Sequence, residues 1–297
     1  QSLAQADDIV IGAATRRLVG GAFDLEDMGD HTLKGIVEAV RAWRVVDVAA
    51  TAGRFAAAHG VRLTPLIGRD EESGLLMRRW RQAVDGEGQV VLLAGEPGIG
   101  KSRLIEAVIE TLRGRQYILL RYQCSPYHVN TPYYSVVERF ERESGMTRDD
   151  QPAERLEKLE RQLTHFGDRL AEVVPLVAGL LSIPLAGRYP EPEISPQEQR
   201  DRTAELLLES VALRTKTLPV LLVLEDAQWA DPSTLGLLAR LVDGAESSPM
   251  LVLVSARPEF EPPWGDHPHA SSLTLNRLGR REGVAMVAAL TEDKGLP

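Results

Sequence analysis

The chain has 297 residues, 43% of them hydrophobic and 26% charged, with a formal net charge of −9 at pH 7. This length and apolar content are sufficient for a sizeable buried core. The acidic balance disfavours a chain-wide electrostatic footprint for nucleic acid or for an anionic membrane, although it does not exclude a local basic patch.

Nothing in the sequence predicts export or membrane insertion. No apolar run approaches the roughly 18 residues that a membrane-spanning helix needs, and no signal peptide is recognisable. The single cysteine, Cys124, permits no internal disulfide and fits a reducing cytoplasm, where we expect the protein to work. Because the chain begins with Gln1 and ends at KGLP without a closing element, we expect a fragment of a longer protein.

The beginning of the chain is predicted to form a small α+β piece. A short apolar strand at 8–12 precedes one or two helical turns at 13–21, and apolar residues alternate with period two at 22–29 and in part of 37–48. Because two or three strands form a poor independent sheet, we expect the end of a larger domain. Residues 48–65 are rich in alanine with scattered glycine, a composition typical of an interdomain linker.

From residue 66 onwards, predicted strands and helices alternate. Continuous apolar runs are typical of strands buried in a parallel sheet, and they occur at 89–94, 117–123, 219–226 and 250–256, with 273–276 as a fifth candidate. We therefore predict an α/β fold in which helices cover both faces of a five-stranded parallel sheet, in three α/β/α layers.

Helices are predicted between these strands. Asp70 is an N-cap candidate, and Asp231 followed by Pro232 predicts another helix start, while a proline-rich loop is expected at 183–196. Helical periodicity or a helix start is found at 70–84, 102–114, most of 133–216, 231–244 and 280–290.

The stretch GEPGIGKS follows the first of the apolar strands and matches G-x-x-x-x-G-K-[ST]. Its glycines let successive backbone N–H groups turn inward around phosphates, and the helix N-terminus that follows adds a positive dipole end. Lys101 is expected to bind the β- and γ-phosphates and Ser102 to bind Mg²⁺, as in the P-loop NTPase fold. The nucleotide-binding residues predicted in this stretch are Gly95, Glu96, Pro97, Gly98, Ile99, Gly100, Lys101, Ser102 and Arg103.

Two acidic residues end the apolar strand of LLVLEDAQWAD. Glu225 and Asp226 are expected to project from its carboxyl edge toward the phosphates, on a strand adjacent to the strand of the glycine loop. Glu225 stands at the usual metal-binding position and Asp226 at the water-activating position. Because Asp is commoner than Glu at the first position, the exchanged assignment stays open.

Arg257 follows the next apolar strand in LVLVSARPE. Beside the acidic strand, its guanidinium is expected to reach the γ-phosphate, with a solvated surface arginine as the alternative. Gln228 is predicted to orient water, and Trp229 to pack.

LIGRDEE, GEPGIGKS, LLVLEDAQWAD and LVSARPE, in this order, resemble the ATPase module of bacterial STAND-type signalling proteins, which are AAA+-related switches. The resemblance covers about 66–297 and implies ATP with Mg²⁺, although nothing in the residues themselves separates ATP from GTP. It also implies that Ile67 and Arg69 lie against the adenine and ribose. We expect an ATPase domain at 66–278 and a truncated helical lid at 279–297, and therefore weak hydrolysis.

RYQCSPYHVNTPYYSVVERFER is similar to members of that family that are fused to nucleotide cyclases. Residues 1–47 look like the C-terminal end of a class III adenylate/guanylate cyclase domain. The resemblance implies that the catalytic residues of the cyclase precede Gln1, so no cyclase activity is expected from this chain. Lys34 is the one residue near a phosphate contact of that family.

We interpret the glycine loop as part of an ATP-dependent switch that holds an inactive, ADP-like state and self-associates when ATP binds. The acidic charge counts against a nucleic-acid loader, and we expect no direct contact with nucleic acid or membrane. Two alternatives stay open: a class III cyclase polypeptide, and an ATP-dependent LuxR-type transcriptional regulator whose DNA-binding domain lies beyond Pro297.

Overall fold

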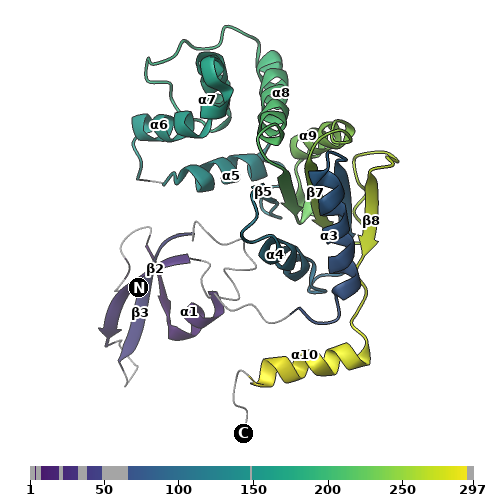
Figure 1. The fold of residues 1–297 in the computed structure, drawn as a ribbon. Helices are drawn as coiled ribbons and strands as arrows, with labels where there is room; N and C mark the ends of the chain where they lie inside the picture. Colours follow the sequence, from purple (N-terminus) through teal and green to yellow (C-terminus); the bar gives the residue numbers. More distant parts are fainter. Residues whose placement is uncertain are drawn as a thin grey trace. The chain divides into compact units, whose positions relative to one another are not determined.

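The protein is described here by a computed structural model that covers residues 4, 8–19, 23–32, 39–48, 66–147 and 149–292 (Figure 1). The chain divides into two compact units. One is Gly68–Arg280, and the other combines Gln1–Ile67 with Arg281–Pro297. No helix in the described ranges is long and apolar enough to cross a membrane.

The smaller unit contains an antiparallel sheet of three strands in the order β1-β3-β2. Trp43 on β3 is buried, and the guanidinium of Arg16 on α1 lies 4.4 Å from the centre of its ring. The expected linker, apart from Val48, and Lys34 lie outside the described residues. The elements of this unit are β1 (Ile9–Gly12), α1 (Ala13–Val19), β2 (Phe23–His31), β3 (Val40–Val48) and most of α10 (Arg280–Glu292).

The larger unit is built on five parallel strands, which confirms the predicted sheet. They are ordered β5-β6-β7-β4-β8. The last strand spans Ala270–Thr274 instead of the expected 273–276. This edge strand is only half-buried, so it does not need a continuous run of apolar residues. Its first residues are therefore not recognisable as a strand from hydrophobicity. The strands are β4 (Gln89–Ala94), β5 (Ile118–Gln123), β6 (Val220–Glu225), β7 (Met250–Ala256) and β8.

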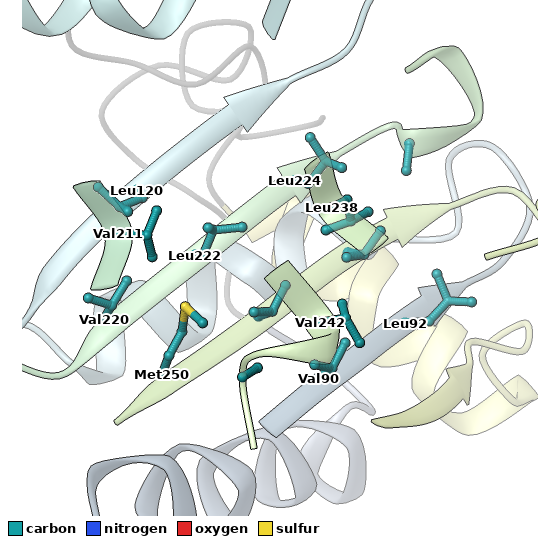
Figure 2. Close-up of a cluster of buried hydrophobic side chains, with 14 of the residues drawn as sticks. Val90, Leu92, Leu120, Val211, Val220, Leu222, Leu224, Leu238, Val242 and Met250 are labelled. Carbon is teal, nitrogen blue, oxygen red and sulfur yellow. The ribbon is translucent and has the colours of Figure 1, made fainter. Parts of the chain in front are cut away.

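Alternating strand residues divide the buried side chains between the two faces of this sheet. On one face, β4, β6 and β7 contribute residues such as Val90, Leu222 and Val252 to a cluster that includes Val211 and Leu238 from helices (Figure 2). The opposite face is contacted by α3 and α4. Helices therefore lie on both faces, as the fully apolar strands predicted.

The helices of the larger unit lie close to their predicted ranges. The expected N-cap of α3 is wrong, because Arg69 occupies the cap position and its carbonyl accepts the Ser73 N–H at 2.9 Å. Asp70 is instead the first residue of the helix, where its negative charge interacts favourably with the positive end of the helix dipole. The helices are α3 (Asp70–Val84), α4 (Lys101–Thr111), α5 (Tyr134–Ser144), α6 (Pro152–Gln162), η1 (Thr164–Arg169), α7 (Leu170–Leu180), α8 (Pro196–Thr215), η2 (Ala227–Trp229) and α9 (Pro232–Asp243).

Helices α5 to α8 and η1 share a second hydrophobic core, in which Phe140, Leu156 and Val173 are almost completely buried. This helical part lies between β5 and β6 in the sequence. The strands β5 and β6 are therefore far apart in the sequence, although they are hydrogen-bonded neighbours in the sheet.

The order of the strands corrects one expectation about the site. Strand β7 lies between β4, which leads into the glycine loop, and β6, which ends at Glu225. The acidic strand is therefore not adjacent to the loop strand. All three strands still end at the same edge of the sheet because they are parallel.

Candidate functional site

The glycine loop connects β4 to α4, the context predicted for it. Gly98 and Gly100 have φ angles of 77° and 104°, which L side chains rarely adopt, and a Cβ atom on either would meet nothing within 4 Å. These glycines thus border open space. Gly95 differs, because a Cβ there would lie 2.9 Å from the Ile99 side chain and 3.2 Å from the Leu275 carbonyl oxygen. Gly95, at the base of the loop, must be glycine because neighbouring atoms leave no room for a side chain. Gly98 and Gly100, at the tip, are favoured as glycine because their backbone is left-handed.

Lys101 is the first residue of α4, and its side chain turns back over the loop. Its Nζ donates to the carbonyl oxygens of Gly95 at 2.6 Å and Glu96 at 3.1 Å. Burial lowers the pKa of Lys101, and the carboxylate of Asp226 opposes that shift while Arg257 adds to it. The ammonium therefore lies within electrostatic reach of residues that follow β6 and β7.

Asp226 directly follows β6 and takes a left-handed conformation, with φ 58° and ψ 44°. Its N–H donates to the Ser255 hydroxyl at 3.2 Å, and its Oδ1 accepts from the Gln228 amide at 3.3 Å. The side-chain Oε1 of Gln228 accepts the backbone N–H of Arg257 at 3.1 Å. Hydrogen bonds thus join the ends of β6 and β7. A non-glycine residue with positive φ is strained by about 1–3 kcal/mol, and such strain often marks functional sites.

The guanidinium of Arg257 lies 5.0 Å from the centre of the Trp229 ring, within the range of a cation–π contact. Arg257 also lies near a charged residue, because its Nη1 is 3.9 Å from Oε1 of Glu259. Trp229 also packs against the sheet core, as predicted, but the sequence did not reveal that it holds the arginine.

Glu225 does not share the surroundings of Asp226. Its side chain is 2% exposed, and its Oε1 accepts from Nε of Arg121 at 2.8 Å and also from Nη2 of that residue. Arg121 lies on β5 and donates from Nη1 to Glu106 on α4 at 2.5 Å. Sequence reasoning missed both partners. One signal was present: an arginine inside the apolar run YILLRYQ requires buried partners.

The remaining predicted contacts have varied surroundings. Arg69 donates to the carbonyl oxygens of Ile99 at 3.2 Å and Asn276 at 2.7 Å, so it ties the start of α3 to the glycine loop. Arg103 pairs with Glu110 at 3.4 Å. Roles for Arg69 and Arg103 in nucleotide binding stay predictions.

The same holds for Ser102, and for Ile67, which belongs to the other unit. Glu96 and Pro97 are exposed on the loop. Within the described ranges, no group of three or more His, Cys, Asp or Glu side chains could hold a metal ion.

Comparison with known proteins identifies the family. An uncharacterized protein of Rhizobium meliloti (strain 1021) is 27% identical over 283 residues, which cover 95% of this chain but 27% of that protein, so the chain spans about a quarter of this relative. Among solved structures, Cdc6p from Pyrobaculum aerophilum shares 17% identity and a TM-score of 0.44, over 79% of this chain and 52% of that one. A structure of Drosophila ORC bound to DNA shares 15% identity and a TM-score of 0.45, over 76% and 47%.

The AAA ATPase domain family matches residues 65–254. This match confirms the predicted AAA+-related ATPase module. Because it extends over more than half of the chain and contains both the glycine loop and Asp226, the chain belongs to the AAA ATPase domain family.

Proposed function

We propose that the unit Gly68–Arg280 binds ATP with Mg²⁺ and works as a nucleotide-dependent switch with slow hydrolysis. One observation carries the proposal: the buried Lys101 ammonium is held over the loop carbonyls at the edge of the sheet where Asp226 and Arg257 follow β6 and β7. An ammonium, a carboxylate and a guanidinium around a glycine loop are the charges that a triphosphate and its cation require.

The open space at Gly98 and Gly100 and the amide-rich start of α4 fit a phosphate chain. Lys101 would exchange its bonds to the loop carbonyls for oxygens of the β- and γ-phosphates. Gln228, hydrogen-bonded to Asp226, would orient the attacking water. Bound Mg²⁺ supplies charge neutralisation, and Ser102 together with the acidic end of β6 would hold it.

A switch needs ATP and ADP to favour different arrangements of the protein. Arg257 is suited to this task because it has two alternative partners: the Trp229 ring that it contacts, and a γ-phosphate that only ATP carries. Its backbone N–H donates to the Gln228 side chain, which in turn donates to Asp226, so a backbone movement at Arg257 would change the hydrogen bonds at the end of β6. This coupling supports a STAND-type signalling switch.

The wider setting is also part of the proposal. Residues 1–47 would be the C-terminal end of a class III cyclase domain, and the three-stranded sheet with α1 over Trp43 supports an α+β origin for them. ATP binding would promote self-association in the cytoplasm, without direct contact of this chain with membrane or nucleic acid. The coding sequence on either side of this segment decides between a cyclase fusion and a LuxR-type regulator.

The test is equilibrium binding of a fluorescent ATP analogue. Lys101→Ala should weaken binding at least a hundredfold, whereas Lys216→Ala, which removes an exposed lysine at the end of α8, should leave it unchanged. A parallel titration with the GTP analogue settles the preferred base. Equal affinity of wild type and a folded Lys101→Ala variant would refute the proposed site.

A further inference from the structure

A buried group of three charges lies beside the candidate site. Arg121 donates to Glu225 from Nε and Nη2 and to Glu106 from Nη1. The side chains of Arg121, Glu106 and Glu225 are 14%, 10% and 2% exposed. They come from β5, α4 and β6, so the group joins the edge strand, the helix that follows the glycine loop and the acidic strand.

Glu225 is therefore already paired with a cation of the protein itself, one that it shares with Glu106. Two N–H donors of Arg121 converge on one of its oxygens, and a planar guanidinium keeps this geometry better than a flexible ammonium. Withdrawing one partner from a buried ion pair is strongly unfavourable, because the remaining charge is left without compensation.

Asp226 has different surroundings. Within the described part of the chain, the hydrogen bond to its carboxylate comes from the neutral Gln228 amide. Asp226 follows β6 at the edge of the sheet where β4 leads into the glycine loop. Of the two adjacent acids, Glu225 is bound to the Arg121 guanidinium, whereas the Asp226 carboxylate accepts a hydrogen bond from a neutral amide.

We propose that Arg121 is a positioning residue that withholds Glu225 from the nucleotide-borne cation, so that Asp226 provides the carboxylate at the phosphate edge. This inference rests on the proposed function and deepens it, because it divides the roles of the two acids. It reverses the assignment that sequence position alone favours, and it gives β5 and α4 a direct influence on the metal requirement of the site.

The experiment measures the Mg²⁺ concentration that half-saturates binding of the fluorescent ATP analogue. Glu225→Gln keeps an acceptor for Arg121 and should change this concentration less than twofold. Asp226→Asn should raise it at least tenfold. Arg121→Gln frees Glu225 and should lower it at least threefold, and the double variant Arg121→Gln with Glu225→Gln should return to within twofold of wild type.

These outcomes separate the inference from the proposed function. If wild type does not bind the analogue at all, the proposed function fails. If wild type binds, but Glu225→Gln raises the half-saturating Mg²⁺ concentration as much as Asp226→Asn does, the division of roles is wrong while the nucleotide site stands. The division of roles would also be overturned if a folded Arg121→Gln variant did not lower the half-saturating Mg²⁺ concentration. Should Arg121→Gln not fold, the comparison of Glu225→Gln with Asp226→Asn still decides.

Discussion

Replacing Asp231 with alanine should destabilise the larger unit far more than the usual loss of a helix cap. Asp231 caps α9, and its Oδ1 accepts the N–H groups of Ser233 and Thr234, each at 3.0 Å. The same atom accepts the Tyr133 N–H at 3.1 Å, and Oδ2 accepts the Thr234 hydroxyl at 2.6 Å. One side chain thus satisfies four donors, and it is 3% exposed.

The magnitude follows from a matched residue in the same chain. Ser195 caps α8, is also followed by proline, is exposed, and accepts one N–H, that of Glu198, at 3.2 Å. Its replacement by alanine should cost about 1 kcal/mol, the usual value for a cap. Asp231→Ala removes a cap and also leaves two further donors unsatisfied, the buried Thr234 hydroxyl and the half-buried Tyr133 N–H, at about 1 kcal/mol or more each, so we expect about 3–4 kcal/mol.

Tyr133 adds a reason for this difference. It has a φ of 56°, and its bond to Asp231 helps to hold that strained conformation at the start of α5. Asp231→Ala should therefore loosen the connection between α9 and the helical part of the unit. Asp231→Asn keeps Oδ1 and loses only the Oδ2 bond, so it should cost about 1 kcal/mol.

The assay is urea denaturation of the three variants, combined with hydrogen exchange. The Tyr133, Ser233 and Thr234 amides should lose protection in Asp231→Ala and keep it in Ser195→Ala. If Asp231→Ala costs no more free energy of unfolding than Ser195→Ala, or if these three amides stay protected, the reasoning from buried donors is refuted.

Two further predictions concern stability. Burial lowers the pKa of His165 to about 4, and its Nε2 lies 2.8 Å from the Ser210 hydroxyl. Because the unfolded chain then binds the proton more readily than the folded chain, stability should fall as the pH drops from about 6.5 toward 4. His165→Gln should therefore flatten the pH dependence of the urea midpoint, and an unchanged dependence in this variant would contradict the prediction. Gly88→Ala should destabilise the protein by about 3 kcal/mol or more, since the new Cβ would lie 1.8 Å from the Ala245 carbonyl oxygen. Gly236→Ala, at an exposed position in α9, should stabilise the protein by up to about 1 kcal/mol. Similar melting temperatures for these two variants would contradict the prediction.

Local features of the site were predictable. GEPGIGKS lies between a strand and a helix as expected, because glycine usage and the change from continuous apolar residues to helical periodicity report backbone conformation over a few residues. The start of α9 at Asp231 and Pro232 was predictable for the same reason. The edge strand β8 was placed too late, since a half-exposed strand lacks a clear apolar run.

By itself, the sequence determined the family, the glycine loop and the presence of apolar strands that bury both faces of a sheet. Only the tertiary structure decided that β7 lies between the loop strand and the acidic strand, that the Asp226 carboxylate accepts from Gln228, and that Glu225 is bound to Arg121. The physical reason is the sequence separation between the residues that determine each feature. Periodicity and capping act within one element, whereas Arg121 and Glu225 are 104 residues apart and meet because β5 and β6 pair in the sheet.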